Sequence, residues 1–232
     1  MQRRNFTSAA VSVIAPWGLV AWSSSARAGE ISDVDAASGV RAALERGAVS
    51  AVGLLGRSGG FLDNPKVRIA LPGFLNDAAK VLKFTGQQQR IDDLVTAMNR
   101  AAEAAVPQAK ALLVSAVKSM SVTDGRRILT GGDDSVTQFF AEKTRQPLSV
   151  TFLPIVTRET QKVSLADKYN AVAGKVSDLG LIKKDDSNIQ KYVTGKALDG
   201  LYLMIGEEER KIRQDPVGTG SAILSKVFGS LR

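Results

Sequence analysis

The sequence predicts an all-α protein, a single globular domain of about nine or ten helices. Apolar residues recur with the helical period in one segment after another, and prolines and glycines separate these segments. Only residues 61–72, FLDNPKVRIALP, alternate between apolar and polar residues as an extended segment does. Because no second segment alternates in this way, we expect a short extended connector or a minimal hairpin and no sheet.

The longest helical pattern, residues 188–215, predicts the central helix. Nearly every residue from 197 to 205 is apolar, so more than one face of this helix must be covered. The run is too short to cross a membrane, which takes about 20 residues. A glycine inside a helix costs about 1 kcal/mol relative to alanine, so we expect neighbouring helices to approach closely at such positions. The glycines here are Gly195, Gly200 and Gly206.

The other helices follow from the same period and from their stop signals. Pro107 is expected to break or kink one helix, and Pro147 to stand in the first turn of another. The chain has no internal repeat and no low-complexity linker, so residues 29–232 are expected to fold as one domain. The predicted ranges are 31–57, 73–84, 87–105, 108–120, 121–131, 133–145, 147–156, 165–179 and 216–231.

Residues 1–28 have the features of a cleavable signal peptide. Basic residues precede an apolar run, and Ala26-Arg27-Ala28 fits the small-x-small rule of a cleavage site. Arg3-Arg4-Asn5-Phe6 also resembles the twin-arginine export motif, from which Gln2 and Thr7 depart. Cleavage after Ala28 by either the twin-arginine or the general secretory route places the protein in the periplasm.

The chain contains no cysteine and no histidine. These absences exclude disulfides, thiol nucleophiles, the Ser-His-Asp triad and the usual zinc ligands. Catalysis would have to rely on carboxylates, lysine and serine. The composition therefore favours a binding or structural role over an enzyme, and we predict no cofactor.

The net charge of +8 is spread along the chain without a basic block. Basic and aromatic residues are not interleaved, so nucleic acid is not an expected partner. The expected partners are a small molecule, a lipid or an envelope protein. Peripheral membrane contact stays open, because residues 226–228 of the last predicted helix either lie on a membrane surface or pack on the core.

Four stretches together resemble one family of bacterial exported proteins, grouped as domain of unknown function 4197. They are FLDNPKVRIALP (61–72), MNRAAEAAVPQAK (98–110), ILTGGDDSVTQFF (128–140) and KALDGLYLMIGEEERKIRQDP (196–216). The resemblance covers most of the chain after the leader. It implies a helical exported domain and brings no reaction, ligand or catalytic residue with it.

The connector is the first candidate binding segment. It places Arg57, Lys66 and Arg68 near the apolar Phe61 and Leu62. Basic side chains around an apolar centre are typical of a lid or an anion-binding rim. The alternative is an ordered crossing without a ligand.

Three polar residues in apolar helices are further candidates. Asn99 and Arg100 lie among small residues, and Arg100 is three residues from Glu103, so the two charges can pair on one face. Asp199 is the single acid of the apolar run 197–205, and a carboxylate buried there needs a partner such as Arg100. These polar residues are expected either to form structural pairs or to line the floor of a polar pocket.

Two acidic groups are weaker candidates. Asp133 and Asp134 follow two glycines, which fits a helix stop and an N-cap, and a carboxylate Ca²⁺ or Mg²⁺ site is the alternative. Residues 207–209, three consecutive glutamates, are expected to form a solvated helix end.

Three functions are compatible with the sequence. The first is a non-enzymatic periplasmic binding or interaction protein that holds a small or lipidic ligand between helices. The second is a carboxylate-dependent hydrolase or transferase that works with carboxylates, lysine and serine, without histidine or cysteine. The third is an envelope scaffold that binds a protein partner.

Overall fold

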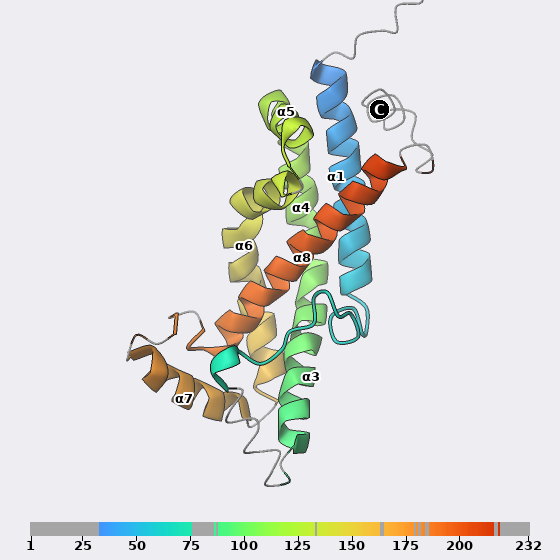
Figure 1. Ribbon diagram of the computed structural model, residues 1–232. Helices are drawn as coiled ribbons and strands as arrows, with labels where there is room; N and C mark the ends of the chain where they lie inside the picture. The colour runs from blue at the N-terminus through green and yellow to red at the C-terminus, as the bar shows by residue number, and fades with distance from the viewer. Residues whose placement is uncertain are drawn as a thin grey trace, which may run out of the picture. The chain divides into compact units, whose positions relative to one another are not determined.

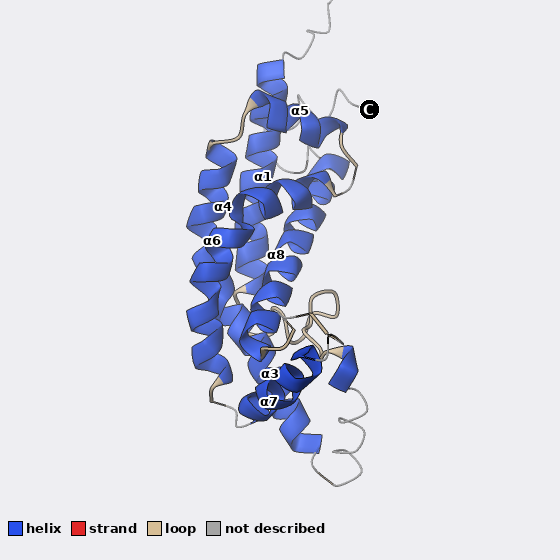
Figure 2. Ribbon diagram, turned by 90° about the vertical axis from the view of Figure 1, so that its left-hand side faces the viewer, coloured by secondary structure: helices blue, strands red, loops and turns tan. Residues whose placement is uncertain are grey.

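The computed structural model describes residues 33–75, 86, 88–132, 134–162, 165–178, 180, 182–183, 186–215 and 218. In this part of the chain the residues form helices, turns and loops and no strand, which confirms the predicted all-α class (Figure 2). None of these helices is both long enough and apolar enough to cross a bilayer. The predicted leader and most of the predicted helices at 73–84 and 216–231 lie outside the described residues.

The helices follow one another along the chain as Figure 1 shows. Their bounds are α1 (Asp33–Leu55), η1 (Gly73–Leu75), α3 (Gln88–Ala105), η2 (Val106–Gln108), α4 (Ala109–Lys118), α5 (Val122–Thr130), α6 (Ser135–Thr160), α7 (Leu165–Asp178) and α8 (Ile189–Gln214). The 3-10 turn η2 joins α3 to α4, so the described residues form six helical rods. The predicted count of nine or ten helices is not supported.

Helix α8 lies at the centre of the packing, mainly against α6 and α1. It begins where the side chain of Asn188 accepts a hydrogen bond from the backbone N–H of Lys191. In Figure 1 it runs diagonally across both partner helices. One face is nevertheless open, because Asp199 and Leu203 are exposed. The expectation that more than one face of residues 197–205 is covered is confirmed, because all of these residues except Asp199 and Leu203 are buried.

The glycines of α8 have different surroundings. A Cβ atom at Gly200 would lie 3.0 Å from the Phe61 ring and 3.1 Å from Val67, and one at Gly206 would lie 3.2 Å from the Thr137 hydroxyl. These two glycines therefore permit a close approach to α8, by the connector at Gly200 and by α6 at Gly206. A Cβ atom at Gly195 would meet nothing within 4 Å, so the expectation of a close approach is wrong there.

Helix α6 is one rod of 26 residues that includes both Pro147 and Pro154. The prediction of two helices, with Pro147 opening the second, is wrong. An interior proline costs about 3 kcal/mol, whereas burying one large apolar side chain stabilises by about 1.5–3 kcal/mol. Packing outweighs the two prolines, because five such side chains of α6 are fully buried: Phe139, Phe140, Leu148, Phe152 and Val156.

The connector, residues 61–72, is held by the side chains of α3 and α8 instead of a second strand. Val67 and Ile69 are buried while Lys66, Arg68 and Ala70 are exposed, so the predicted alternation is present. Val67 lies against Gly200 of α8, where an added Cβ atom would be closer to it than ordinary van der Waals contact.

Asn99 of α3 supplies the backbone pairing that a sheet would otherwise give. Its side-chain oxygen accepts a bond from the N–H of Ile69 (2.8 Å), and its Nδ2 donates to the C=O of the same residue (2.9 Å). One turn further along α3, Glu103 accepts the N–H groups of Phe61 and Leu62, both at 3.1 Å. Asn99 and Glu103 thus hold both ends of the connector.

The glutamates at 207–209 are not the solvated helix end that the sequence predicts. Glu209 is only 4% exposed and accepts a hydrogen bond from Arg213 (2.7 Å). Glu208 accepts one from Ser50 of α1 (2.8 Å), and Glu207 pairs with Lys66 (2.8 Å). Glu207 and Glu208 thus join the C-terminal half of α8 to the connector and α1, and Glu209 pairs within the helix.

Replacing Asn99 with alanine tests the connector contact. Asn99→Ala leaves a buried N–H and a buried C=O of Ile69 without partners, at about 1–3 kcal/mol each. We expect a loss of about 2–4 kcal/mol in urea unfolding and faster hydrogen exchange of the Ile69 amide. Asn64→Ala is the matched control, because the side chain of Asn64 accepts a hydrogen bond from the exposed turn N–H of Lys66. Equal losses in the two variants would contradict the role of Asn99.

The capping box of α5 predicts a pH dependence. Asp124 accepts the backbone N–H and the hydroxyl of Ser121 (3.1 and 2.8 Å), and these bonds hold its pKa below the usual 3.8. The stabilisation is therefore present above pH about 3.8 and is lost as the pH falls through the lower folded-state pKa. Asp124→Asn should unfold up to about 1 kcal/mol more easily at neutral pH, with the difference from wild type shrinking in acid. A difference independent of pH would refute this.

Candidate binding grooves along α8

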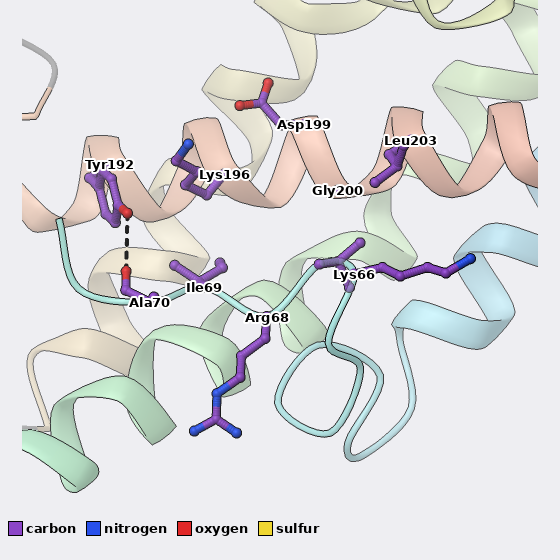
Figure 3. Close-up of a pocket in the computed structure, with 10 residues that line it drawn as sticks. Lys66, Arg68, Ile69, Ala70, Tyr192, Lys196, Asp199, Gly200 and Leu203 are labelled. Atoms are coloured by element: carbon purple, nitrogen blue, oxygen red, sulfur yellow. Dashed lines mark hydrogen bonds between the residues drawn. The ribbon is translucent and has the colours of Figure 1, made fainter. Parts of the chain in front are cut away.

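Two surface grooves share the exposed face of α8. The larger groove, of about 720 Å³, is lined by α6, α8 and the loop between α7 and α8. The smaller groove, of about 320 Å³, is lined by α8 and the connector (Figure 3). Tyr192, Lys196 and Asp199 line both. Their spacing of four and three residues places them on one helix face, which Leu203 continues.

Tyr192 fixes the connector side of the grooves. Its hydroxyl donates to the C=O of Ala70 at 3.0 Å, a bond drawn in Figure 3. Burial raises the pKa of Tyr192, and the charge of Asp186 raises it further, so the phenol stays a neutral donor. In the same view Lys196 and Asp199 project away from the connector.

Arg145 fixes the α6 side. Its guanidinium donates to Asp199 (2.6 Å), and its Cζ lies 5.3 Å from the centre of the Tyr202 ring. The Tyr202 hydroxyl in turn lies 3.0 Å from that of Thr144. Burial raises the pKa of Tyr202. Arg145 is therefore held in place from two directions.

Side chains of helix α7 hold Asp186, which lines the larger groove, and the first residue of α8 in place. The hydroxyl of Tyr169 donates to the C=O of Asp186 (2.7 Å), and burial raises the pKa of this tyrosine. Asn170 accepts the N–H of Ile189, the first residue of α8, at 2.8 Å. These bonds therefore hold a lining residue of the larger groove and the start of α8.

The lining of the larger groove combines basic and aliphatic side chains. Val150 and Leu153 of α6 are 67% and 36% exposed, which is unusual for large apolar residues. The basic residues are Arg145, Lys183, Lys191 and Lys196. The acids are Asp186 and Asp199. A surface of this kind is suited to a ligand with a negative charge and an apolar part.

The structure brings three of the sequence-predicted site residues to the grooves and leaves four outside. Lys66, Arg68 and Asp199 line the smaller groove, and Asp199 lines the larger one as well. Lys66 is paired with Glu207, and Arg68 donates to the C=O of Leu62. The residues that line neither groove are Arg57, Phe61, Asn99 and Arg100.

The four residues outside the grooves are either buried in the core or lie at the surface away from the grooves. Phe61, the first residue of the connector, and Asn99 of α3 are fully buried, and Arg57 is exposed after the end of α1. Arg100 forms the predicted pair with Glu103 at 2.6 Å and also donates to Ser58.

The expectation of a buried Asp199 is wrong. Its side chain is 53% exposed, and its partner is Arg145 of α6 instead of Arg100. The prediction that it pairs with an arginine is nevertheless met. The helical pattern misplaced the residue because α8 leaves one face open along α6.

Sequence reasoning missed most of the larger groove. The polar residues Tyr192, Lys196 and Asp199 recur at helical spacing on an otherwise apolar helix, and this was the available signal. Val150 and Leu153 gave no such signal, because aliphatic residues in a helical pattern normally face the core.

The metal candidates gain no support. Asp133 lies outside the described residues, and Asp134 is exposed at the start of α6 without a capping bond from its side chain. No group of three acids that could hold a metal ion occurs within the described ranges.

Comparison with known proteins identifies the family. A family model described as "Protein of unknown function (DUF4197)" matches residues 30–229. The chain belongs to the DUF4197 family. The match includes the connector, α3, α6 and α8, and so every residue of both grooves. Searches of the curated proteins and of the solved structures gave no match for this DUF4197 chain.

Removing Asp199 should have little effect on stability. The side chains of Arg145 and Asp199 are 43% and 53% exposed, and such surface pairs contribute about 0–1 kcal/mol. We therefore expect Asp199→Ala to unfold within about 1 kcal/mol of wild type in a urea titration. A loss above about 2 kcal/mol would show that Asp199 is a core contact after all.

Proposed function

We propose that the protein is a non-enzymatic binding protein and that it holds a small or lipidic ligand in the grooves along α8. The observation that carries this proposal is the place of Gly195 in the lining of the larger groove. A glycine inside a helix costs about 1 kcal/mol relative to alanine. No neighbour demands one here, because a Cβ atom would have nothing within 4 Å. Keeping the groove open accounts for the residue.

Thr194 supports the same site. It lines the larger groove and is 4% exposed, and its hydroxyl has no hydrogen-bond partner among the described residues. A buried polar group without a protein partner is normally satisfied by a ligand or a water molecule. The groove volume also lies within the range of ligand pockets, about 300–1,000 Å³. The proposed site lies on the surface between α6 and α8, and not deep in the helix packing.

We place this function in the periplasm, on the strength of the leader predicted at residues 1–28. The export route, twin-arginine or general secretory, does not alter the proposal. A protein partner is the second candidate, because exposed Val150 and Leu153 also suit a contact with an envelope protein.

A carboxylate-dependent hydrolase or transferase is supported less well. Such an enzyme needs two acids free to exchange protons. The acids of the larger groove are Asp186 and Asp199, and Arg145 already holds Asp199.

Native mass spectrometry of the protein purified from its own cells tests the proposal. We expect additional mass that disappears on denaturation, and less of it in Gly195→Met, whose side chain would enter the groove. Methionine is a good helix former, so loss of folding would not explain the result. Gly53→Met is the matched control, because Gly53 of α1 is exposed and also has an open Cβ position. Equal loading of the two variants would place the ligand elsewhere, and added mass in the form of a polypeptide would favour the partner protein.

A further inference from the structure

The charges of the larger groove define the sign of its ligand. Arg145 and Asp199 neutralise each other at 2.6 Å. Among the described residues of the lining, three lysines and one further acid, Asp186, remain, and since Lys191 has an interaction of its own, the positive charge offered to a ligand comes from Lys183 and Lys196. The lysines are Lys183, Lys191 and Lys196.

Lys183 and Lys196 are exposed and form no ion pair with any carboxylate in the described part of the chain. They come from different elements, the loop before α8 and α8 itself, and both line the larger groove. Lys66, Arg100 and Arg213, by contrast, are paired with Glu207, Glu103 and Glu209. The excess of positive charge at the groove therefore attracts an anion.

The aliphatic side chains define the rest of the ligand. Val150 and Leu153 are three residues apart, so they lie on one face of α6. Together with Leu203 in the smaller groove, they account for three of the five exposed large apolar residues in the described part of the chain. An apolar ligand segment that covered them would remove this surface from water, and the hydrophobic effect would favour its binding.

We propose that the larger groove binds an anionic single-chain lipid. One carboxylate or phosphate group lies among Lys183, Lys191 and Lys196, above the open position at Gly195, and the alkyl chain lies across Val150 and Leu153. This inference rests on the proposed function and adds the charge and the form of the ligand to it.

Isothermal titration calorimetry with three probes tests the proposal. Dodecanoate carries both features, dodecyltrimethylammonium carries the same chain with the opposite charge, and acetate carries the head group alone. Below their micelle concentrations, we expect dodecanoate to bind and the other two to bind at least about tenfold more weakly, a difference of about 1.4 kcal/mol. Binding of dodecanoate should weaken in about 1 M salt, where the Debye length falls to about 3 Å.

Charge reversal on the chain locates the site. Lys196→Glu should weaken dodecanoate binding about tenfold or more, and Lys110→Glu should leave it unchanged. Lys110 is an exposed lysine of α4 that lines neither groove, so it controls for net charge. Equal effects of the two variants, or equal binding of the cationic and anionic detergents, would overturn the proposal.

The inference and the proposed function fail in different ways. If the mass carried by the native protein belongs to a neutral or cationic molecule, the anionic lipid is wrong and the binding function stands. If acetate binds as tightly as dodecanoate, the site takes a free anion and not a lipid. If no probe binds and no mass is carried, both proposals are overturned.

Discussion

The structure depends on one constraint: an extended segment is buried among helices with no strand beside it. Val67 lies against Gly200 and Ile69 is also buried, so their backbone is carried away from water along with their side chains. Buried N–H and C=O groups need partners: a turn within the connector supplies one for the N–H of Val67, through the C=O of Asn64, whereas the partners of Ile69 come from outside the connector. Asn99 meets this need because an amide side chain offers a donor and an acceptor with the same spacing as a peptide group. The side of α8 that the connector covers, and hence the smaller groove, follows from this contact.

Helix α8 has different tasks in its two halves. In its C-terminal half the glutamates are joined to Ser50, Lys66 and Arg213, and hydrogen bonds from Lys211 and Ser50 outweigh the effect of burial to lower the pKa of Glu208. The acids of this half are therefore bound to partners. The N-terminal half has lysines at the groove, of which Lys196 has no carboxylate partner among the described residues.

The sequence predicted what local periodicity can reveal. The bounds of α1 and α8 were expected at 31–57 and 188–215 and are observed at 33–55 and 189–214, because both helices have clear apolar patterns. Alternation gave the connector correctly. The break at Pro147 was wrong because the packing of α6 outweighs a local penalty. The burial of Asp199 was wrong for a related reason: the neighbours of α8 decide which face is open, and those neighbours are far away in the sequence. Of the site, the connector cations and Asp199 were found from local patterns, and the helical spacing of Tyr192 and Lys196 was a signal that went unused; the rest of the larger groove is made by α6, α8 and a loop together.

Gly195 separates the demands of folding from those of binding. Folding alone would favour alanine there, because the helix would gain about 1 kcal/mol and no neighbour would have to move. Gly200 gives the opposite case: a Cβ atom would press against Phe61 and Val67, so packing alone explains that glycine. Different physical reasons therefore account for these two glycines, although they lie only five residues apart on one helix. The one without a packing cause lies between Thr194 and Lys196 in the lining of the larger groove. Gly53 of α1 also has an open Cβ position, so it is the place of Gly195 in the lining, and not its open position alone, that connects it with binding.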